Sequence, residues 1–432
     1  MLASGVSPGR TRFATTPGRL RLRAVVAAVV ASTVGLAIAV LVVGIRADAA
    51  NIADEQVPAI VNIRQVQTEL AAANAAASVA FLAGGVENRE MREVYERSLA
   101  SAARHLEVAI RLTNDDDSEN HALLASLVEA LPRYSGLIET ARANNRQGFP
   151  VGAAYLESAA ALLRDEIFPA TDDVANNAAQ SYRSAYDSQR QSKLFVYLAV
   201  GGVVLALIVF LIVIQLGLSA RFKRTLNLPL VGATLAAIGL LSWQMLAIAS
   251  YHSGSGDARQ EGYRATRLYL DLRTDGFAAR ANQARFLIAR GAGEQFNEAF
   301  EQRAQGVVET QLQLDEHLSE LAVAAGSEQE LLTELTDIWS AYVDNHQLVV
   351  EQERAGRQSQ AAQTVLGESN RLFFEFDRLT AQGLVAASED FDHDMAGSVS
   401  GLRTLQYGGV LIGALVAALS VYGLQLRINE YR

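Results

Sequence analysis

The sequence predicts an all-α membrane protein with four transmembrane helices and two tandem extracytoplasmic four-helix bundles, related by an internal duplication. Three observations predict this fold. Half of the 432 residues are hydrophobic, and they gather in four long stretches that are almost free of charge. Acidic segments with helical periodicity separate these stretches. Finally, a pattern of residues in the first acidic segment recurs in the second.

The four apolar stretches are long enough to cross a bilayer, because about 20 helical residues span its hydrocarbon core. They predict transmembrane helices at residues 22–45, 194–218, 228–250 and 405–426. Few ionisable residues lie within these spans, and such residues usually mark the path of a transported substrate. Transport is therefore a disfavoured function.

Basic residues predict the orientation, because the cytoplasmic flanks of transmembrane helices collect lysine and arginine. They dominate the arm at 1–21, the link at 219–227 and the tail at 427–432. We therefore expect a plasma-membrane protein with both termini in the cytoplasm. The two acidic segments, 46–193 and 251–404, are then extracytoplasmic. Their acidity argues against nucleic acid as a partner, because a phosphate-binding surface needs a basic patch.

The three cytoplasmic parts are too short to hold a kinase or a cyclase. Any signal received outside must therefore pass to a separate cytoplasmic protein. The basic residues of the link, Arg221, Lys223 and Arg224, are candidates for this relay.

The first outer segment reads as four amphipathic helices. Ile63, Val66 and Leu70 step by three and four, which is the spacing of one helix face. The first helix is expected to end at Gly84–Gly85, because glycine accepts the left-handed backbone that closes a helix. A turn around Gly148 separates the third helix from the fourth, which continues into the second span.

The second outer segment repeats this plan. Three residue pairs recur at the same spacing of 208 positions: Tyr134 and Tyr342, Arg146 and Arg354, Gly148 and Gly356. Gly254 and Gly256 are expected to loosen the start of this segment, after the third span. Recurrence of a whole helical plan predicts a tandem duplication.

Four turns are expected at the ends of the bundles farthest from the membrane. We call Gly84–Gly85, Arg146–Pro150, Arg290–Gly293 and Arg354–Arg357 the apical turns, and they are the outer surfaces most available to a partner. Phe149 among arginines is unusual for a plain turn, and such anchors are enriched at interfaces. A plain turn explains the glycine and proline equally well. The candidate partner-binding residues are Gly84, Gly85, Arg146, Gln147, Gly148, Phe149, Pro150, Arg290, Arg354 and Gly356.

Nothing in the sequence predicts an enzyme, and we expect no catalytic residue, cofactor or metal. The chain has no cysteine, and its six histidines show no close metal-binding spacing. The aspartates at 115–117 lack the alternating ligands and central glycine of a calcium loop. Arg64 on the first bundle helix could bind the carboxylate of a ligand, although a surface arginine is the simpler interpretation.

The segments FATTPGRLRL (13–22), FLAGG (81–85) and YSGLIETARANNRQGFPVGAAYL (134–156) resemble the actinobacterial GlnX family of four-span membrane proteins. The resemblance is concentrated in the N-terminal half. It implies a signal relay between an extracytoplasmic amino-acid-binding lipoprotein of the GlnH type and a cytoplasmic Ser/Thr kinase of the protein kinase G type. The family offers no catalytic or binding motif to place on this chain.

The bundles also resemble the four-helix sensor domains of bacterial chemoreceptors, whose dimers pair four spans. One chain supplies four spans here, so a covalent pseudo-dimer is expected, while a homodimer of two chains stays open. Two rival functions remain. The protein could bind amino acids directly, at a site such as Arg64, or it could be an envelope scaffold without a signalling role.

Overall fold

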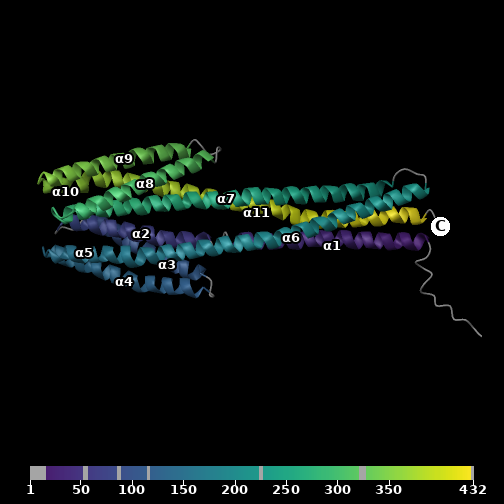
Figure 1. Ribbon diagram of the computed structural model, residues 1–432, viewed down its shortest axis with the longest axis horizontal. Helices are drawn as coiled ribbons and strands as arrows, with labels where there is room; N and C mark the ends of the chain where they lie inside the picture. The colour runs from purple at the N-terminus through teal and green to yellow at the C-terminus, as the bar shows by residue number, and fades with distance from the viewer. Residues whose placement is uncertain are drawn as a thin grey trace, which may run out of the picture. The chain divides into compact units, whose positions relative to one another are not determined.

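The computed structural model describes residues 16–51, 57–84, 89–113, 117–222, 227–320 and 327–429, and within these ranges it contains helices and turns but no strand. Figure 1 shows the helices in chain order. They are α1 (Thr16–Asn51), α2 (Val57–Leu82), α3 (Arg89–Leu112), α4 (Ser118–Arg146), α5 (Val151–Leu162), the π-helical turn η2 (Leu163–Ile167), α6 (Phe168–Phe222), α7 (Leu228–Ile288), α8 (Glu294–Glu320), α9 (Ser327–Arg354), α10 (Gln358–Thr364), the π-helical turn η3 (Val365–Ser369) and α11 (Asn370–Asn429).

Four of these helices contain stretches long and apolar enough to cross a membrane: Gly18–Gly44, Leu198–Leu218, Leu228–Leu246 and Gln406–Leu426. The predicted all-α fold class with four membrane-spanning helices is thereby confirmed. Whether the two halves arose by duplication stays a prediction.

The chain divides into two compact units. The span unit comprises residues 1–51, 184–257 and 394–432, and the bundle unit comprises residues 52–183 and 258–393. Helices α6, α7 and α11 belong to both units, with 55, 61 and 60 residues respectively. The bundles are therefore joined to the spans by unbroken helices.

The glycines expected to loosen the start of the second outer segment lie inside a helix. Helix α7 runs through Gly254 and Gly256 without interruption. A glycine inside a helix costs only about 1 kcal/mol relative to alanine. The combined free-energy cost of two glycines is therefore too small to end a helix whose segments before and after them are held by packing.

Close backbone contact joins the first and last helices of the span unit. A Cβ atom on Gly35 would lie 3.0 Å from the carbonyl oxygen of Gly409, and one on Gly413 would lie 3.0 Å from the carbonyl oxygen of Ala31. Gly409 and Gly413 form a G-x-x-x-G motif, which lets transmembrane helices approach closely. Between α6 and α7, Gln215 Nε2 donates a 2.8 Å hydrogen bond to Thr234 Oγ1, which satisfies polar groups inside the apolar unit.

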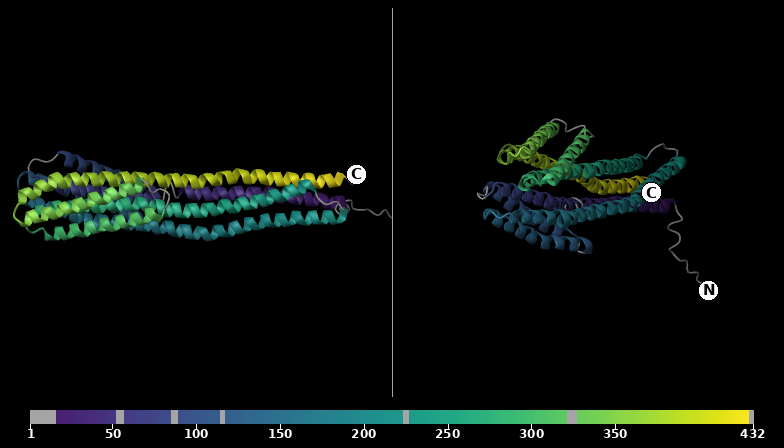
Figure 2. Two further views of the ribbon diagram at one scale, coloured as in Figure 1. Left: turned by 90° about the horizontal axis from the view of Figure 1, so that it is seen from above. Right: turned by 60° about the vertical axis from the view of Figure 1, so that its left-hand side comes forward.

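The bundle unit has α2 and α7 at its centre. Figures 1 and 2 show these two helices between the α3–α5 layer on one side and the α8–α10 layer on the other. Residues 70–80 of α2 and 279–287 of α7 are buried without exception. The hydroxyl oxygens of Thr68 and Thr274 lie 2.8 Å apart across this contact.

Alanine makes the central contact possible. Ala71, Ala72 and Ala75 of α2 join the hydrophobic core that α7, α8, α9 and α11 form, while Ala73 and Ala76 face the core of the first bundle. Small side chains around the whole helix let neighbours approach from every direction. The two bundles, expected as separate domains, fall in one compact unit, and α2 contributes residues to the core of each.

Tyr134 and Tyr342, which the sequence aligns, are both fully buried. Tyr134 lies among leucine and alanine side chains of α2, α3, α4 and α5. Tyr342 lies among aromatic rings, with the ring of Trp339 at 5.3 Å and that of Phe373 at 5.5 Å between centroids. The same position thus anchors a core in each bundle, but the two cores differ in composition.

The aspartate run ends in a helix cap. Asp117 Oδ1 accepts a 3.1 Å hydrogen bond from the backbone N–H of Asn120 at the start of α4, which satisfies one of the unpaired donors of a helix N-terminus. Residues 114–116 lie outside the described residues. Within the described ranges, no cluster of three or more histidine, aspartate or glutamate side chains could hold a metal ion.

Candidate functional site

The apical turns come together at one end of the bundle unit. Gly84, Gly148, Gly291 and Gly356 each have a positive φ, between 73° and 84°. Glycine populates this region without the steric cost that other residues meet. The predicted turns are therefore built on left-handed glycines, and Figures 1 and 2 show these helix ends on the same side of the unit. Gly85 lies outside the described residues.

Contacts within the first bundle and between the two bundles hold this end together. Asn145 Nδ2 donates a 2.9 Å hydrogen bond to the carbonyl oxygen of Phe81. Arg285 of α7 forms an ion pair with Glu157 of α5. Leu82 packs on a cluster of second-bundle residues that includes Phe286. The apical turns therefore form one composite surface.

The first-bundle part of this surface is apolar and exposed. Residues 146–150 are all exposed. Phe149 is 52% exposed, and Val151 and Tyr155 beside it are 48% and 36% exposed. The structure thus confirms the exposure expected for Phe149 and adds two apolar neighbours to it.

The other candidate residues have different surroundings. Arg64 Nη1 lies 2.8 Å from Asp172 Oδ1, so its guanidinium already forms an ion pair with a carboxylate of the protein. Arg290 has a φ of 44° beside Gly291, which fits a turn rather than a helix. Arg221 belongs to the last turn of α6. The other two link residues, Lys223 and Arg224, lie outside the described residues.

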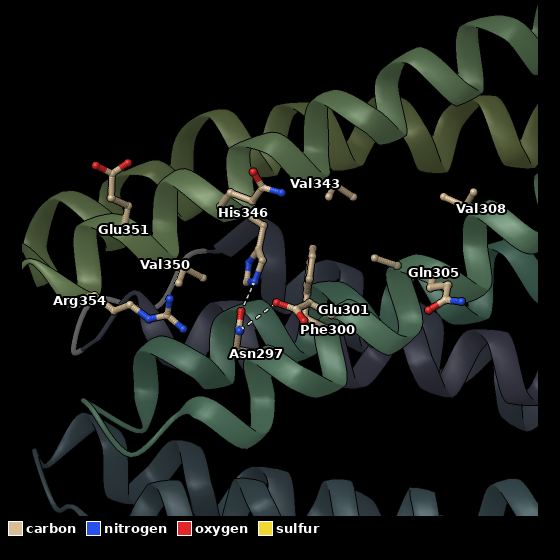
Figure 3. A pocket seen from close by; sticks show the side chains of 12 residues that line it. Asn297, Phe300, Glu301, Gln305, Val308, Val343, His346, Val350, Glu351 and Arg354 are labelled. Atoms are coloured by element: carbon tan, nitrogen blue, oxygen red, sulfur yellow. Dashed lines mark hydrogen bonds between the residues drawn. The ribbon is translucent and has the colours of Figure 1, made fainter.

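A cavity of about 690 Å³ lies between α8 and α9, next to the apical turns. Its size is within the range of about 300–1,000 Å³ typical of small-molecule sites. Figure 3 shows the side chains that line it. The buried floor consists of Asn297, Phe300, Ala304, His346 and Val350, and the rim consists of Glu301, Gln305, Val308, Gln347, Glu351 and Arg354 together with the half-buried Val343.

A chain of hydrogen bonds runs from the core to the rim of this cavity. Tyr342 Oη donates to Gln283 Oε1 at 3.1 Å, and Gln283 Nε2 lies 3.4 Å from His346 Nδ1. His346 Nε2 lies 3.0 Å from Asn297 Oδ1. Because Gln283 presents a donor to Nδ1, the proton of His346 is on Nε2, and it is donated to Asn297.

The chain ends at two carboxylates. Asn297 Nδ2 donates to Glu294 Oε1 and to Glu301 Oε1, each at 3.2 Å. Figure 3 shows His346, Glu301 and Asn297 converging in this way. Every donor in the series therefore points outward, from a buried tyrosine to acidic groups at the surface.

His346 stays neutral. Burial lowers the pKa of His346 to about 3, because a charged imidazolium would lose its hydration in the core. Its ring stacks on Phe300 with 3.5 Å between the ring centroids. The floor of the cavity is therefore rigid and uncharged at physiological pH.

Arg354, which the sequence placed among the docking residues, lies at the mouth of the cavity. Its Nη2 is 3.1 Å and 3.2 Å from the two carboxylate oxygens of Glu294. The sequence did not indicate the rest of the site. A usable signal was present, since His346 follows Tyr342 by four residues on the apolar face of the helix, where a polar residue needs a buried partner.

Fold and site together define a four-span helical membrane protein with a bundle unit that carries an exposed apical surface and a ligand-sized cavity. Residues 48–187 match the family model of the actinobacterial sensor domain. This range contains the first bundle and amounts to less than half of the chain. Comparisons with curated proteins and with solved structures give no match.

The match supports a sensor of an actinobacterial family and, with it, a sensor or signalling role. The cavity lies in the second bundle, outside the matched residues. The finer resemblance to the GlnX family stays a prediction.

Proposed function

We propose that this protein is a transmembrane signal relay without catalytic activity of its own. Its bundle unit lies outside the plasma membrane, and both termini lie in the cytoplasm. The apical turns bind an amino-acid-binding lipoprotein of the GlnH type. The resulting state passes to a cytoplasmic Ser/Thr kinase of the protein kinase G type.

The continuity of α6, α7 and α11 is the observation that carries this proposal. Helix α7 ends at the apical turn beside Arg290, whereas α6 and α11 continue α5 and α10 from the other apical turns through the π-helical turns η2 and η3. All three helices extend through a predicted span. A small slide or rotation of such a helix reaches its far end because there is no loop to absorb it. The partner must bind the two helix arrangements with different affinity, since otherwise the equilibrium does not shift.

The apolar group Phe149, Val151 and Tyr155 supports docking at the first bundle. Aromatic side chains such as Phe149 and Tyr155 are enriched in protein interfaces. The acidic bundle segments and the basic link and tail support the orientation, because lysine and arginine collect on the cytoplasmic side.

Phe149→Asp tests docking on the full-length protein. We expect this variant to recover at least about tenfold less lipoprotein than wild type in affinity capture from native membranes, because it places a charge in the anchor position. Capture is compared with and without added amino acids. Val128→Asp is the matched control, since Val128 is 49% exposed on α4 outside the apical turns. Equal recovery by wild type and Phe149→Asp would refute the apical assignment. Gly148 is unsuitable as a probe because its φ is 73°.

Direct sensing of a small molecule is the second candidate function. The cavity between α8 and α9 favours it, because a lipoprotein relay by itself does not require a cavity of about 690 Å³ in the bundle unit. Binding and docking could also act together, since Arg354 belongs both to an apical turn and to the cavity rim.

A further inference from the structure

We propose that the cavity between α8 and α9 binds a small organic cation, an aliphatic ammonium with its apolar body on the floor and its charged group at the Glu301 rim. This inference deepens the proposed sensor role by naming a class of ligand. Its biological meaning rests on that role, whereas the binding itself can be measured independently of docking.

The floor selects an apolar body. Phe300, Ala304 and Val350 are buried beneath the opening, and Val343 and Val308 extend the apolar surface toward the rim. Val308 remains 45% exposed. Covering such surface contributes roughly 25 cal/mol for each Å² removed from water.

The polar groups of the floor cannot bind an anion. His346 uses its one N–H on Asn297, and Asn297 uses its amide on Glu294 and Glu301. Arg354 could pair with an anion, but its Nη2 already contacts both carboxylate oxygens of Glu294 at the exposed mouth. An anionic ligand would therefore find no available donor on the buried floor and would meet carboxylates at the rim.

The rim carries an excess of negative charge. Glu301 and Glu351 line the cavity, and within the described part of the chain neither has a basic side chain at ion-pair distance. Figure 3 shows the Glu301 carboxylate beside Phe300, where apolar floor and acidic rim meet. An ammonium group placed there gains a charge-assisted hydrogen bond while its alkyl chain covers the floor.

A ligand in this position bridges two helices. Glu301 and Phe300 belong to α8, and Val343 and His346 belong to α9. Filling the space between α8 and α9 would fix their separation next to an apical turn. The cavity is thus placed to affect the surface that the proposed partner contacts.

Calorimetry on the full-length protein in lipid nanodiscs tests the proposal with three probes of equal chain length: hexylammonium, hexanoate and hexanol. Hexylammonium is expected to bind about two- to fivefold more tightly than hexanol, since a semi-exposed ion pair contributes up to about 1 kcal/mol. Hexanoate is expected to bind more weakly than either. No saturable binding of hexylammonium, or tighter binding of hexanoate, would overturn the proposal.

Three variants locate the site. Ala304→Leu should abolish saturable binding by filling the floor, because Ala304 is 6% exposed there. Glu301→Gln should weaken hexylammonium about two- to fivefold without affecting hexanol. Glu316→Gln, an exposed position on α8 outside the cavity, is the matched control and should bind like wild type. Binding that Ala304→Leu leaves unchanged would assign the heat to the lipid and overturn the proposal.

These outcomes are independent of docking. Loss of lipoprotein capture in Phe149→Asp with intact hexylammonium binding supports both functions. Intact lipoprotein capture without hexylammonium binding refutes ligand binding in the cavity and leaves the docking proposal standing.

Discussion

The two bundles share a helical plan but fill their interiors differently. The first core consists mainly of alanine, leucine and isoleucine around Tyr134. The second core groups Trp339, Phe373 and Phe376 around Tyr342 in tilted and edge-on contacts, with ring centroids between 4.7 Å and 5.7 Å apart. One plan therefore supports two kinds of interior.

The difference affects which chemistry each bundle can carry. Alanine-rich helices pack closely, which suits a scaffold that presents an exposed tip. Aromatic rings hold helices farther apart, and polar groups such as His346 and Gln283 then enter the interior. The family match covers the first bundle and the cavity lies in the second. We infer that docking and ligand binding are divided between the halves in the same way.

The largest expected effect is in the second core. Phe373→Ala should lower the free energy of unfolding by about 3–5 kcal/mol, because Phe373 is fully buried and contacts Phe277 at 5.2 Å between ring centroids. Ala102→Gly at a fully buried position of the first core should cost about 1 kcal/mol. Thermal unfolding of the full-length protein in nanodiscs measures both.

Val385→Ala, at a position that is 57% exposed on α11, is the control and should leave the unfolding free energy within about 0.5 kcal/mol of wild type. If Phe373→Ala behaved like this control, the aromatic core would not be the stabilising feature inferred here.

Acid should destabilise the second bundle through His346. Its pKa is lowered from 6.5 to about 3 in the folded state, so the unfolded chain binds a proton that the folded chain does not. The free energy of unfolding therefore has its full value above about pH 6.5. Below that pH it falls by about 1.4 kcal/mol per pH unit, so the total loss at pH 5 is about 2 kcal/mol. The check is the unfolding free energy of wild type and His346→Gln against pH.

The variant removes the imidazole while retaining polar atoms, so its slope against pH should be smaller. Glu69, Asp271 and Asp275 have pKa values raised by burial, and they stabilise the fold as the pH falls. Because wild type and variant share these carboxyl groups, the difference between the two curves isolates His346. Parallel curves would contradict the prediction.

The smallest effects concern the turns that the halves share. Gly148 and Gly356 have φ values of 73° and 74°, and a Cβ atom on either would meet open space. Alanine at each position should therefore cost the same, about 1–2 kcal/mol, purely from backbone strain. Unequal costs in thermal unfolding would show that the two turns are not equivalent, despite their identical spacing in the sequence.

Much of the fold could be predicted because its signals are local. Apolar length predicts the spans, apolar periodicity predicts the bundle helices, and glycine predicts the left-handed turns at Gly84, Gly148 and Gly356. The exposure of Phe149 also follows from its place in a turn. These features depend on residues close together in the chain.

The remaining features depend on contacts between distant residues. The run from Ala71 to Ala80 has no charged residue and only Asn74 and Ser78 as polar ones, which is typical of a helix buried on all sides. The spacing of Ile63 and Val66, however, indicates only one buried face. Similarly, the G-x-x-x-G motif at Gly409 and Gly413 gives no indication of its partner Gly35. The cavity forms only when α8 and α9 are placed together.

The alanine-lined contact between α2 and α7 has a mechanical consequence. Interlocking side chains resist displacement, whereas methyl groups of equal size form a nearly smooth surface. A slide of α7 along α2 therefore meets little steric resistance at Ala71, Ala72 and Ala75. The Thr68–Thr274 hydrogen bond opposes the slide with only about 1 kcal/mol. The contact between α2 and α7 therefore offers little steric or hydrogen-bonding resistance to the helix displacement that the proposed relay requires.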